Sequence, residues 1–272
     1  MSERLEEVET RLAAIGDLGS VVDAMRALAA VRLQQATAAL GGTRTYAGVV
    51  QSAFARALSA LPQTRPDGKG PRTARGVIVF AAEHGFVGAF EEPLLERLRT
   101  EGAVAAVMVA GSRGAAMLEE HGVRPAWCVP MATQVGGVMA VARRVADRLA
   151  ALTAHRLGRV DLLYRTHPHG VALEPLYPTG LPTHVAVPGP APLFGLPPAE
   201  LVDHLADEYL FARLAHAAME SFAAENAARL SVMLSAGQNV KDRLEDLSRL
   251  ANRLRQDLTT QELAELTIDR GE

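Results

Sequence analysis

Two short stretches of the sequence carry residues whose types and spacing could support chemistry. The turn VAGSRGAAM (109–117) is rich in glycine and lies between an apolar run and a helical pattern, as a phosphate-binding loop would. It contains neither G-x-G-x-x-G nor G-x-x-x-x-G-K-[ST], so a tight turn between a strand and a helix is the favoured interpretation. DGKG (67–70) has a lysine but no preceding strand and no following Ser or Thr, and we predict a loop there.

The second stretch, AAEHGFVGAF (81–90), follows an apolar run, where α/β sheets place their binding sites. Glu83 and His84 could act as an acid–base pair, and Gly85 and Gly88 indicate a sharp turn of the backbone. The pattern fixes no third group beside this pair. A catalytic role is therefore the less favoured interpretation.

Metal, cofactor and nucleophile sites are not predicted. The histidines lack the spacing of metal ligands, both in THPHG (166–170) and at the scattered positions His155, His184, His204 and His216. No serine occupies a nucleophile elbow. The single cysteine, Cys128, lies in the apolar run AWCV; it rules out an intrachain disulfide and is expected to be a buried, inert thiol.

The elements that would position these stretches form an α/β pattern between residues 75 and 166. Short β-branched runs (GVIVFAA, AVAAVMVAG, VDLLYRT and, less clearly, VRPAWCVP) alternate with helical segments. This alternation predicts right-handed crossovers and a mainly parallel, Rossmann-like sheet. Residues 175–198 are rich in Pro and Gly, so we expect only an edge strand near VALEPLYP.

Long helices with a heptad pattern flank this α/β segment. Apolar or small residues recur at steps of three and four near the N-terminus, at Leu5, Val8, Leu12, Ile15, Gly19, Val22, Ala29, Leu33, Ala36 and Leu40, with Arg26 as one polar slot. The same steps recur near the C-terminus, at Leu230, Met233, Gly237, Val240, Leu244, Leu247, Ala251, Leu254 and Leu258. A period of 3.5 is typical of a coiled coil. We predict an antiparallel pair of helices, 1–61 and 199–272, with an α/β domain, 62–198, inserted between them.

Composition limits the function classes. The chain has 272 residues, 4% aromatic residues and a net charge of −3, which favours helix and gives no overall cationic surface for nucleic acid. The start, MSERLEEVETRL, lacks the apolar region of a secretory signal. The longest apolar stretch, 103–110, is too short to cross a bilayer. We expect a soluble or peripheral protein without membrane insertion.

The segment NRLRQDLTTQEL (252–263) carries Asn, Arg, Gln, Thr and Glu at fixed steps between leucines. A helix that met only water would be expected to carry Glu and Lys pairs four residues apart, yet the chain has only two lysines, Lys69 and Lys241. Arg, Gln and Thr are suited to specific hydrogen bonds. This pattern indicates a helix that contacts a partner.

The sequence resembles the gamma subunit family of F-type ATP synthases over nearly its whole length. The similarity lies in RLAAIGDLGSVVDAMRALAAVRLQQA (11–36), VIVFAAEHGFVGAF (77–90), VAGSRG (109–114), ENAARLSVMLSAGQN (225–239) and NRLRQDLTTQEL. The last two stretches are the most specific, because their spaced polar residues match family positions.

The resemblance implies a rotor shaft that couples ion flow to ATP synthesis or hydrolysis. The two helices would stand inside a ring of alpha and beta subunits, which hold the nucleotides, and the α/β domain would contact epsilon and the membrane c-ring. The subunit itself would bind no cofactor and catalyse nothing. Its location would be peripheral, at the cytoplasmic face of the bacterial inner membrane.

The resemblance also implies which residues contact the ring. Four positions in the terminal helix would hydrogen-bond the beta subunit: Arg255, Gln256, Thr260 and Glu262. Asn239 and Asn252 also match family positions, whereas Arg229 and Met25 match positions implicated in coupling. Arg26 and Arg32 would present positive charge to an acidic loop of beta.

Departures from the family pattern leave alternatives open. Asp17 and Asp23 make the first helix acidic, AAEHGFVG replaces the usual S-D-[RK]-G-L-C-G, and the end, TIDRGE, is charged. These departures would suit the gamma subunit of a divergent, sodium-translocating F-type ATPase. Two remoter alternatives are a Rossmann-like nucleotide-binding enzyme, which would bind NAD or ATP, and a coiled-coil adaptor, which predicts no discrimination among substitutions of Gln256, Thr260 and Glu262.

Overall fold

The computed structural model describes residues 2–61, 74–153, 157–168, 170–177 and 195–269. The chain divides into two compact units. The helix-pair unit comprises Met1–Ala29 and Arg229–Glu272, and the sheet unit comprises Ala30–Ala228. DGKG (67–70) and most of the Pro- and Gly-rich stretch lie outside the described residues.

The sheet unit is built on five strands, which are β1 (Arg75–Phe80), β2 (Ala106–Ala110), β3 (Trp127–Val129), β4 (Arg159–Thr166) and β5 (Gly170–Tyr177). Their order is β3-β2-β1-β4-β5. The first four strands are parallel, and β5 runs antiparallel to β4 at the edge, where Pro175 is tolerated. The predicted mainly parallel sheet and its edge strand are confirmed.

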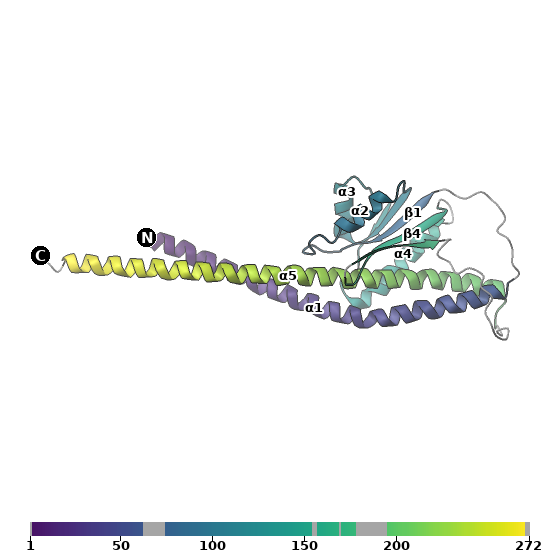
Figure 1. Cartoon of the computed structure of the whole chain (residues 1–272), viewed down its shortest axis with the longest axis horizontal. Helices are drawn as coiled ribbons and strands as arrows, with labels where there is room; N and C mark the ends of the chain where they lie inside the picture. The colour runs from purple at the N-terminus through teal and green to yellow at the C-terminus, as the bar shows by residue number, and fades with distance from the viewer. Residues whose placement is uncertain (1, 62–73, 154–156, 169, 178–194, 270–272) are drawn as a thin grey trace. The chain divides into compact units, whose positions relative to one another are not determined.

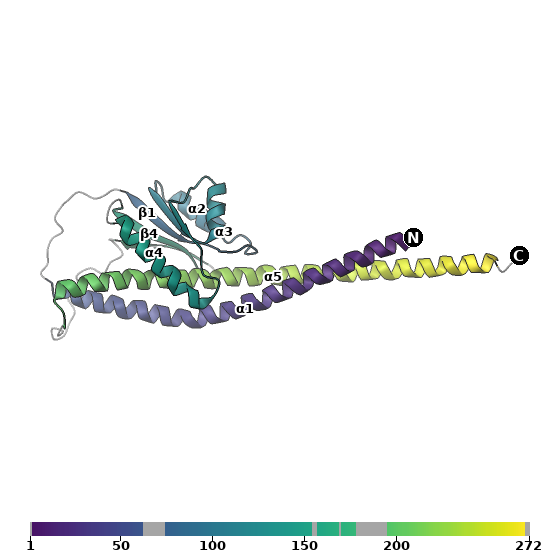
Figure 2. The same cartoon turned by 180° about the vertical axis from the view of Figure 1, so that it is seen from behind.

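Helices cover both faces of this sheet (Figures 1 and 2). One face packs against α2 (Glu92–Thr100) and α3 (Ser112–Glu120). The other packs against α4 (Val138–Thr153), which follows a 3-10 turn (Val135–Gly137), and against parts of the two long helices. Successive strand residues point to opposite faces, so Val77 and Val79 join the first core and Ile78 and Phe80 join the second.

The two long helices are α1 (Ser2–Ser59) and α5 (Pro198–Asp269). In the helix-pair unit they run antiparallel: Val8 packs with Ala251 and Leu254 near one end, and Gly19 faces Val240 further along. A Cβ atom at Gly19 would lie 3.1 Å from Val240 Cγ1, so the glycine lets the two helices approach closely.

The heptad prediction is confirmed position by position. Every apolar or small residue of the two predicted seams is buried or half-buried, whereas Arg26, the polar slot, is exposed. The predicted fold class, an antiparallel pair of terminal helices with an inserted parallel-sheet domain, is therefore the fold observed.

Candidate partner-binding surface

The glycines of VAGSRG serve packing. Gly111 has φ of 129°, and a Cβ there would lie 2.5 Å from the carbonyl oxygen of Ala81. A Cβ at Gly114 would lie 2.1 Å from the Ala81 Cβ. Both positions need glycine because the start of α3 packs directly onto the end of β1. This confirms the interpretation of the stretch as a tight turn between a strand and a helix.

The N-terminus of α3 already holds an anion from the protein itself. The Glu83 carboxylate accepts hydrogen bonds from the Ser112 backbone N–H at 2.9 Å, the Ser112 hydroxyl at 2.9 Å and the Met131 backbone N–H at 2.7 Å. These bonds occupy the place where a phosphate would bind. Glu83 thus joins three loops at the carboxyl edge of the sheet, which gives it a structural role in place of the acid–base role considered for it.

The turn after Glu83 differs from its prediction in one detail. The backbone adopts left-handed φ angles at Phe86 (61°) and Gly88 (59°), so Gly88 behaves as expected. Gly85 is not among the glycines with positive φ, and Phe86 takes the strained position instead. Phe86 is 65% exposed, because the tight turn points its ring away from the sheet core.

The usual ligand position of such a sheet is taken by α5. Open α/β sheets bind ligands beyond the carboxyl ends of the strands where the strand order reverses, here beside β1 and β4. The Ser221 hydroxyl donates to the Phe80 carbonyl at 2.8 Å, and the Glu220 carboxylate accepts from the His167 backbone N–H at 3.0 Å. Side chains of α5 therefore satisfy polar groups at the ends of both strands.

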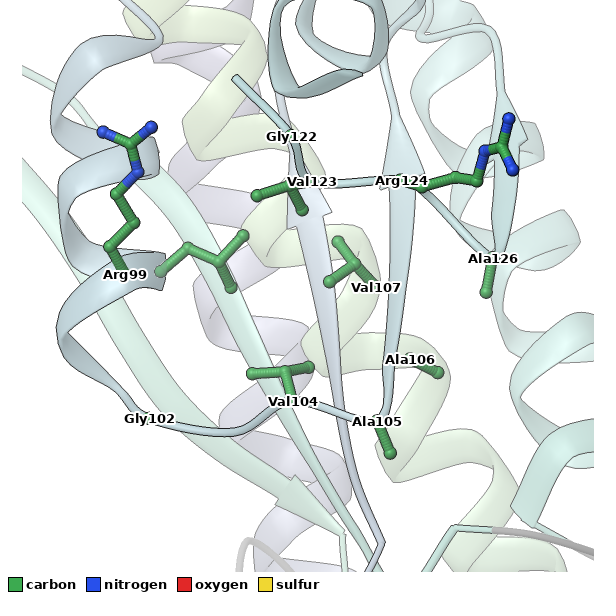
Figure 3. Close-up of a pocket in the computed structure, with 11 residues that line it drawn as sticks. Arg99, Gly102, Val104, Ala105, Ala106, Val107, Gly122, Val123, Arg124 and Ala126 are labelled. Carbon is green, nitrogen blue, oxygen red and sulfur yellow. The ribbon is translucent and has the colours of Figure 1, made fainter. Parts of the chain in front are cut away.

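A shallow pocket of about 360 Å³ lies at the opposite, amino-terminal edge of the sheet (Figure 3). Its floor contains Val104, Val107 and Val123, and Arg99 and Arg124 flank it. Arg99 donates to the His121 carbonyl at 3.4 Å. The described residues that line this pocket include no acid, imidazole, hydroxyl or thiol, so it offers no catalytic group.

The remaining candidates for chemistry are also explained. Cys128 is exposed on the edge strand β3, so the expectation that it is buried was wrong. Partial desolvation raises the pKa of its thiol, and Glu83 and Glu119 raise it further, which disfavours the reactive thiolate. Within the described ranges, no three His, Cys, Asp or Glu side chains gather as metal ligands; His155, His169 and His184 lie outside those ranges.

The polar set predicted in the terminal segment of α5 lies outside the buried seam. Asn252, Arg255, Gln256 and Thr260 are exposed, whereas Ala251 and Leu254 between them are buried. The helical period places these polar groups on faces that the partner helix leaves open. Glu262 belongs to the same helix, but its side chain is outside the described set.

The exposed groups of this segment form hydrogen bonds within the helix-pair unit. Arg255 donates to Glu9 at 2.8 Å and to Asn252 at 3.2 Å, with both charged side chains about half exposed. The Thr260 hydroxyl donates to the Gln256 carbonyl at 2.9 Å. Such exposed bonds are weak and can be exchanged for bonds to a partner.

The other predicted contact residues differ in exposure. Asn239 and Arg26 are exposed, and Met25 and Arg32 are half-buried. Arg26 pairs with Asp23 at 3.0 Å, so part of its positive charge is neutralised inside its own helix. Arg229 is buried, at 6% exposure, unlike the other predicted contact residues whose side chains are described.

A second apolar line on α1 was missed by the sequence analysis. Leu18, Val21 and Leu28 are 53%, 56% and 49% exposed, and half-buried Met25 lies among them. These four residues, the exposed apolar stripe, follow steps of three, four and three, like the buried seam beside it. This spacing of three and four residues is the sequence feature from which the stripe could have been predicted. An exposed stripe of this kind indicates a surface that meets another protein.

The helix pair also forms a groove of about 550 Å³. Gly16, Gly19 and Gly237 are among the residues that line it, together with the polar and charged groups Asp23, Arg26, Gln238 and Lys241. The helix-pair unit thus presents an exposed apolar stripe on α1 and, separately, a groove with polar and charged lining between α1 and α5.

No helix in the described part of the chain is both long and apolar enough to cross a membrane. The long helices instead carry charged residues throughout, among them the ion pairs Arg11–Glu7 and Arg249–Glu245.

Comparisons with known proteins cover nearly the whole chain. A family model described as ATP synthase matches residues 4–268. The ATP synthase gamma chain of Frankia casuarinae is 29% identical, with 98% of this chain and 96% of that protein aligned, and the gamma chain of Moorella thermoacetica is 25% identical over 96% of each. A chain from the Euglena gracilis mitochondrial ATP synthase (OSCP/F1/c-ring, rotational state 3) shares the fold, with a TM-score of 0.68 at 16% identity, over 98% of this chain and 93% of that one.

Proposed function

The chain belongs to the ATP synthase gamma-chain family, and from this membership we propose that it is the rotor shaft of an F-type complex. In this role the helix pair turns inside a ring of alpha and beta subunits. Its rotation couples the flow of protons or sodium ions to ATP synthesis or hydrolysis. We propose that the chain itself binds no nucleotide and performs no catalysis.

The observation that carries this proposal is the exposed polar set on α5. Asn252, Arg255, Gln256 and Thr260 face outward on a helix whose buried seam is already complete. Arg, Gln and Thr side chains exposed on a helix can form specific hydrogen bonds with a partner. We propose that Arg255, Gln256, Thr260 and Glu262 hydrogen-bond the beta subunit.

The exposed apolar stripe and the neighbouring charges support contacts on α1 as well. Leu18, Val21 and Leu28 expose large apolar side chains to water. We propose that this stripe, which includes Met25, meets the ring during rotation, as do the charged residues Arg26 and Arg32. Asn239 contributes a further contact. Arg229 is buried, and we propose that it acts in coupling by stabilising α5, the helix to which it belongs.

The remaining partners follow from the same proposal. We propose the functional division 1–61, 62–198 and 199–272, in which the inserted domain contacts epsilon and the c-ring. Central-stalk and c-ring assemblies among the structural neighbours support this assignment. The chain would then be a peripheral component at the cytoplasmic face of a bacterial inner membrane.

The proposal is tested by co-expression with the alpha and beta subunits of the same organism's F-type complex. We expect a complex with one copy of this chain per ring, and ATP hydrolysis that changes when the chain is omitted. Well-folded alpha and beta subunits that never retain the chain would contradict the proposal.

A matched pair of arginines sharpens the test. Arg255 and Arg253 are both exposed on α5, but only Arg255 is a proposed ring contact. We expect Arg255→Ala to reduce ATP-driven ion pumping relative to hydrolysis, with little change in assembly. Arg253→Ala should leave this ratio unchanged, and an equal loss in both variants would overturn the assignment of Arg255.

A further inference from the structure

A buried carboxyl group just before α2 takes no part in the functions described above. Glu91 is 6% exposed, and its Oε1 atom has no hydrogen-bond partner. It stands at the N-cap position of α2 without making a side-chain capping bond. An ionised carboxylate is costly to bury with an unpaired oxygen, whereas a neutral carboxyl is buried more easily.

Charged groups on α2, α3, β4 and α5 interact electrostatically with Glu91. Glu225 on α5 is another buried acid, at 3% exposure, and Glu92 follows on α2 itself. The cations are Arg113 on α3 and Arg165 on β4. Arg113 is exposed, and the Arg165 guanidinium lies 5.5 Å from the Phe90 ring centroid with its Nε atom unpartnered. Neither cation forms a hydrogen bond with the Glu91 Oε1 atom.

This environment favours the protonated form of Glu91. Burial is the main cause that raises its pKa to about 7, and Glu225 and Glu92 raise it further, while a hydrogen bond to the backbone of Glu91 itself and, less strongly, Arg113 oppose them. Two neighbouring buried carboxylates resist simultaneous ionisation.

We propose that Glu91 is a proton-operated latch, whose neutral carboxyl keeps the start of α2 packed against α5 and whose ionisation releases it. The latch goes beyond the proposed rotor function and does not depend on the ring. Because Glu225 belongs to α5, the latch joins the sheet unit's α2 to the helix that continues into the proposed ring contacts.

The pH dependence has a defined sign. In the closed state Glu91 titrates near pH 7, whereas in an open, hydrated state it returns toward its ordinary value of 4.5. The closed state therefore holds the proton more tightly. Its added stability is complete below about pH 4.5 and is lost as the pH rises to about 7. Each pH unit in that window changes the opening equilibrium about tenfold at most.

Hydrogen–deuterium exchange of the full chain tests this latch. Amides of α2 would be followed at pH 5, 6, 7 and 8 in the wild type, Glu91→Gln and Glu92→Gln. Comparing variants at the same pH cancels the intrinsic pH dependence of exchange. Glu92→Gln is the matched control, because Glu92 is adjacent and exposed.

We expect the α2 amides of the wild type to become less protected from exchange than the same amides of Glu91→Gln as the pH rises from 5 to 7. Above pH 7 the difference in protection between the two proteins should stay constant. Glu92→Gln should follow the wild type. The same protection in wild type and Glu91→Gln at every pH would overturn the latch.

Two further measurements keep the proposal testable if Glu91→Gln folds poorly. Infrared spectra of the wild type should show a protonated carboxyl band that disappears between pH 6 and 8, and absence of such a band would refute the proposal. Glu225→Gln removes a neighbouring negative charge, so it should move that transition to lower pH. An unchanged or raised midpoint would count against the role of Glu225.

Discussion

The sheet unit and the helix-pair unit bury their apolar residues to very different extents. In the sheet unit, Ile78 and Leu162 are fully enclosed between layers of helices. In the helix-pair unit, Val8, Ala251 and Leu254 are buried, but Leu12 and Leu247 beside them are only half-buried. When only two helices pack together, each helix covers a single stripe of the other and its remaining faces stay exposed. The sheet unit therefore completes its own core, whereas the helix pair leaves surface for a partner.

The largest expected effect tests this contrast directly. Leu162→Ala should lower the free energy of unfolding by about 3–5 kcal/mol, because it leaves a cavity in a fully packed core. Leu247→Ala should cost only about 1–2 kcal/mol, since its side chain already meets water. A fully buried leucine at this position would cost about 2–5 kcal/mol instead. Chemical denaturation of both variants measures the difference, and equal losses would break the comparison.

A buried ion pair gives the next effect within the sheet unit. Arg75 on β1 donates to Asp161 on β4 at 2.6 Å and to Glu101 after α2 at 2.9 Å. Asp161 is 1% exposed, so Arg75→Met would leave a buried carboxylate whose remaining ion pair, among the residues that the structure describes, is with Arg159. We expect a loss of about 3 kcal/mol in the free energy of unfolding.

The control for Arg75 is Arg159, which binds the same carboxylate at 3.1 Å but is 52% exposed. Arg159→Met should cost less than about 1 kcal/mol. Similar losses in the two variants would show that Asp161 does not depend on the buried partner.

Glu83 provides a smaller effect at the carboxyl edge of the sheet. Glu83→Gln removes the charge from an anion that accepts three hydrogen bonds from Ser112 and Met131. We expect a loss of about 1–3 kcal/mol, because the N-terminus of α3 favours a negative charge. Thermal unfolding measures it. A stabilised Glu83→Gln variant would show instead that the carboxylate is strained there and that this turn is not primarily structural.

Periodic features of the fold could be predicted from sequence because they depend on near neighbours. The heptad steps from Leu5 to Leu40 and from Leu230 to Leu258 predicted both seams, since residues at these steps lie on one face of a helix and are buried together. The β-branched runs likewise predicted the parallel strands. In the candidate surface, the family pattern and the spacing together identified the exposed set at 252–260.

Other features depend on contacts between distant residues and left no local signal. The Arg75–Asp161 pair joins positions far apart in the chain, and Glu83 is engaged by Ser112 and Met131 from two other loops. Cys128 was misjudged because an apolar run does not reveal whether its strand lies at the edge of the sheet. The exposed apolar stripe had a visible period, but sequence alone does not say which of two adjacent stripes is covered.

The smallest effect on stability gives the most specific test of the helix pair. Thr259 and Thr260 are both exposed on α5, and each hydroxyl donates to the carbonyl four residues earlier at 2.9 Å. Thr259→Ala and Thr260→Ala should each change the free energy of unfolding by less than about 0.5 kcal/mol. Only Thr260 is a proposed ring contact, so only Thr260→Ala should lower ATP-driven pumping per ATP hydrolysed in the assembled complex. Equal coupling in the two variants would remove Thr260 from the contact set, and unfolding of the Thr260→Ala chain would make its role structural.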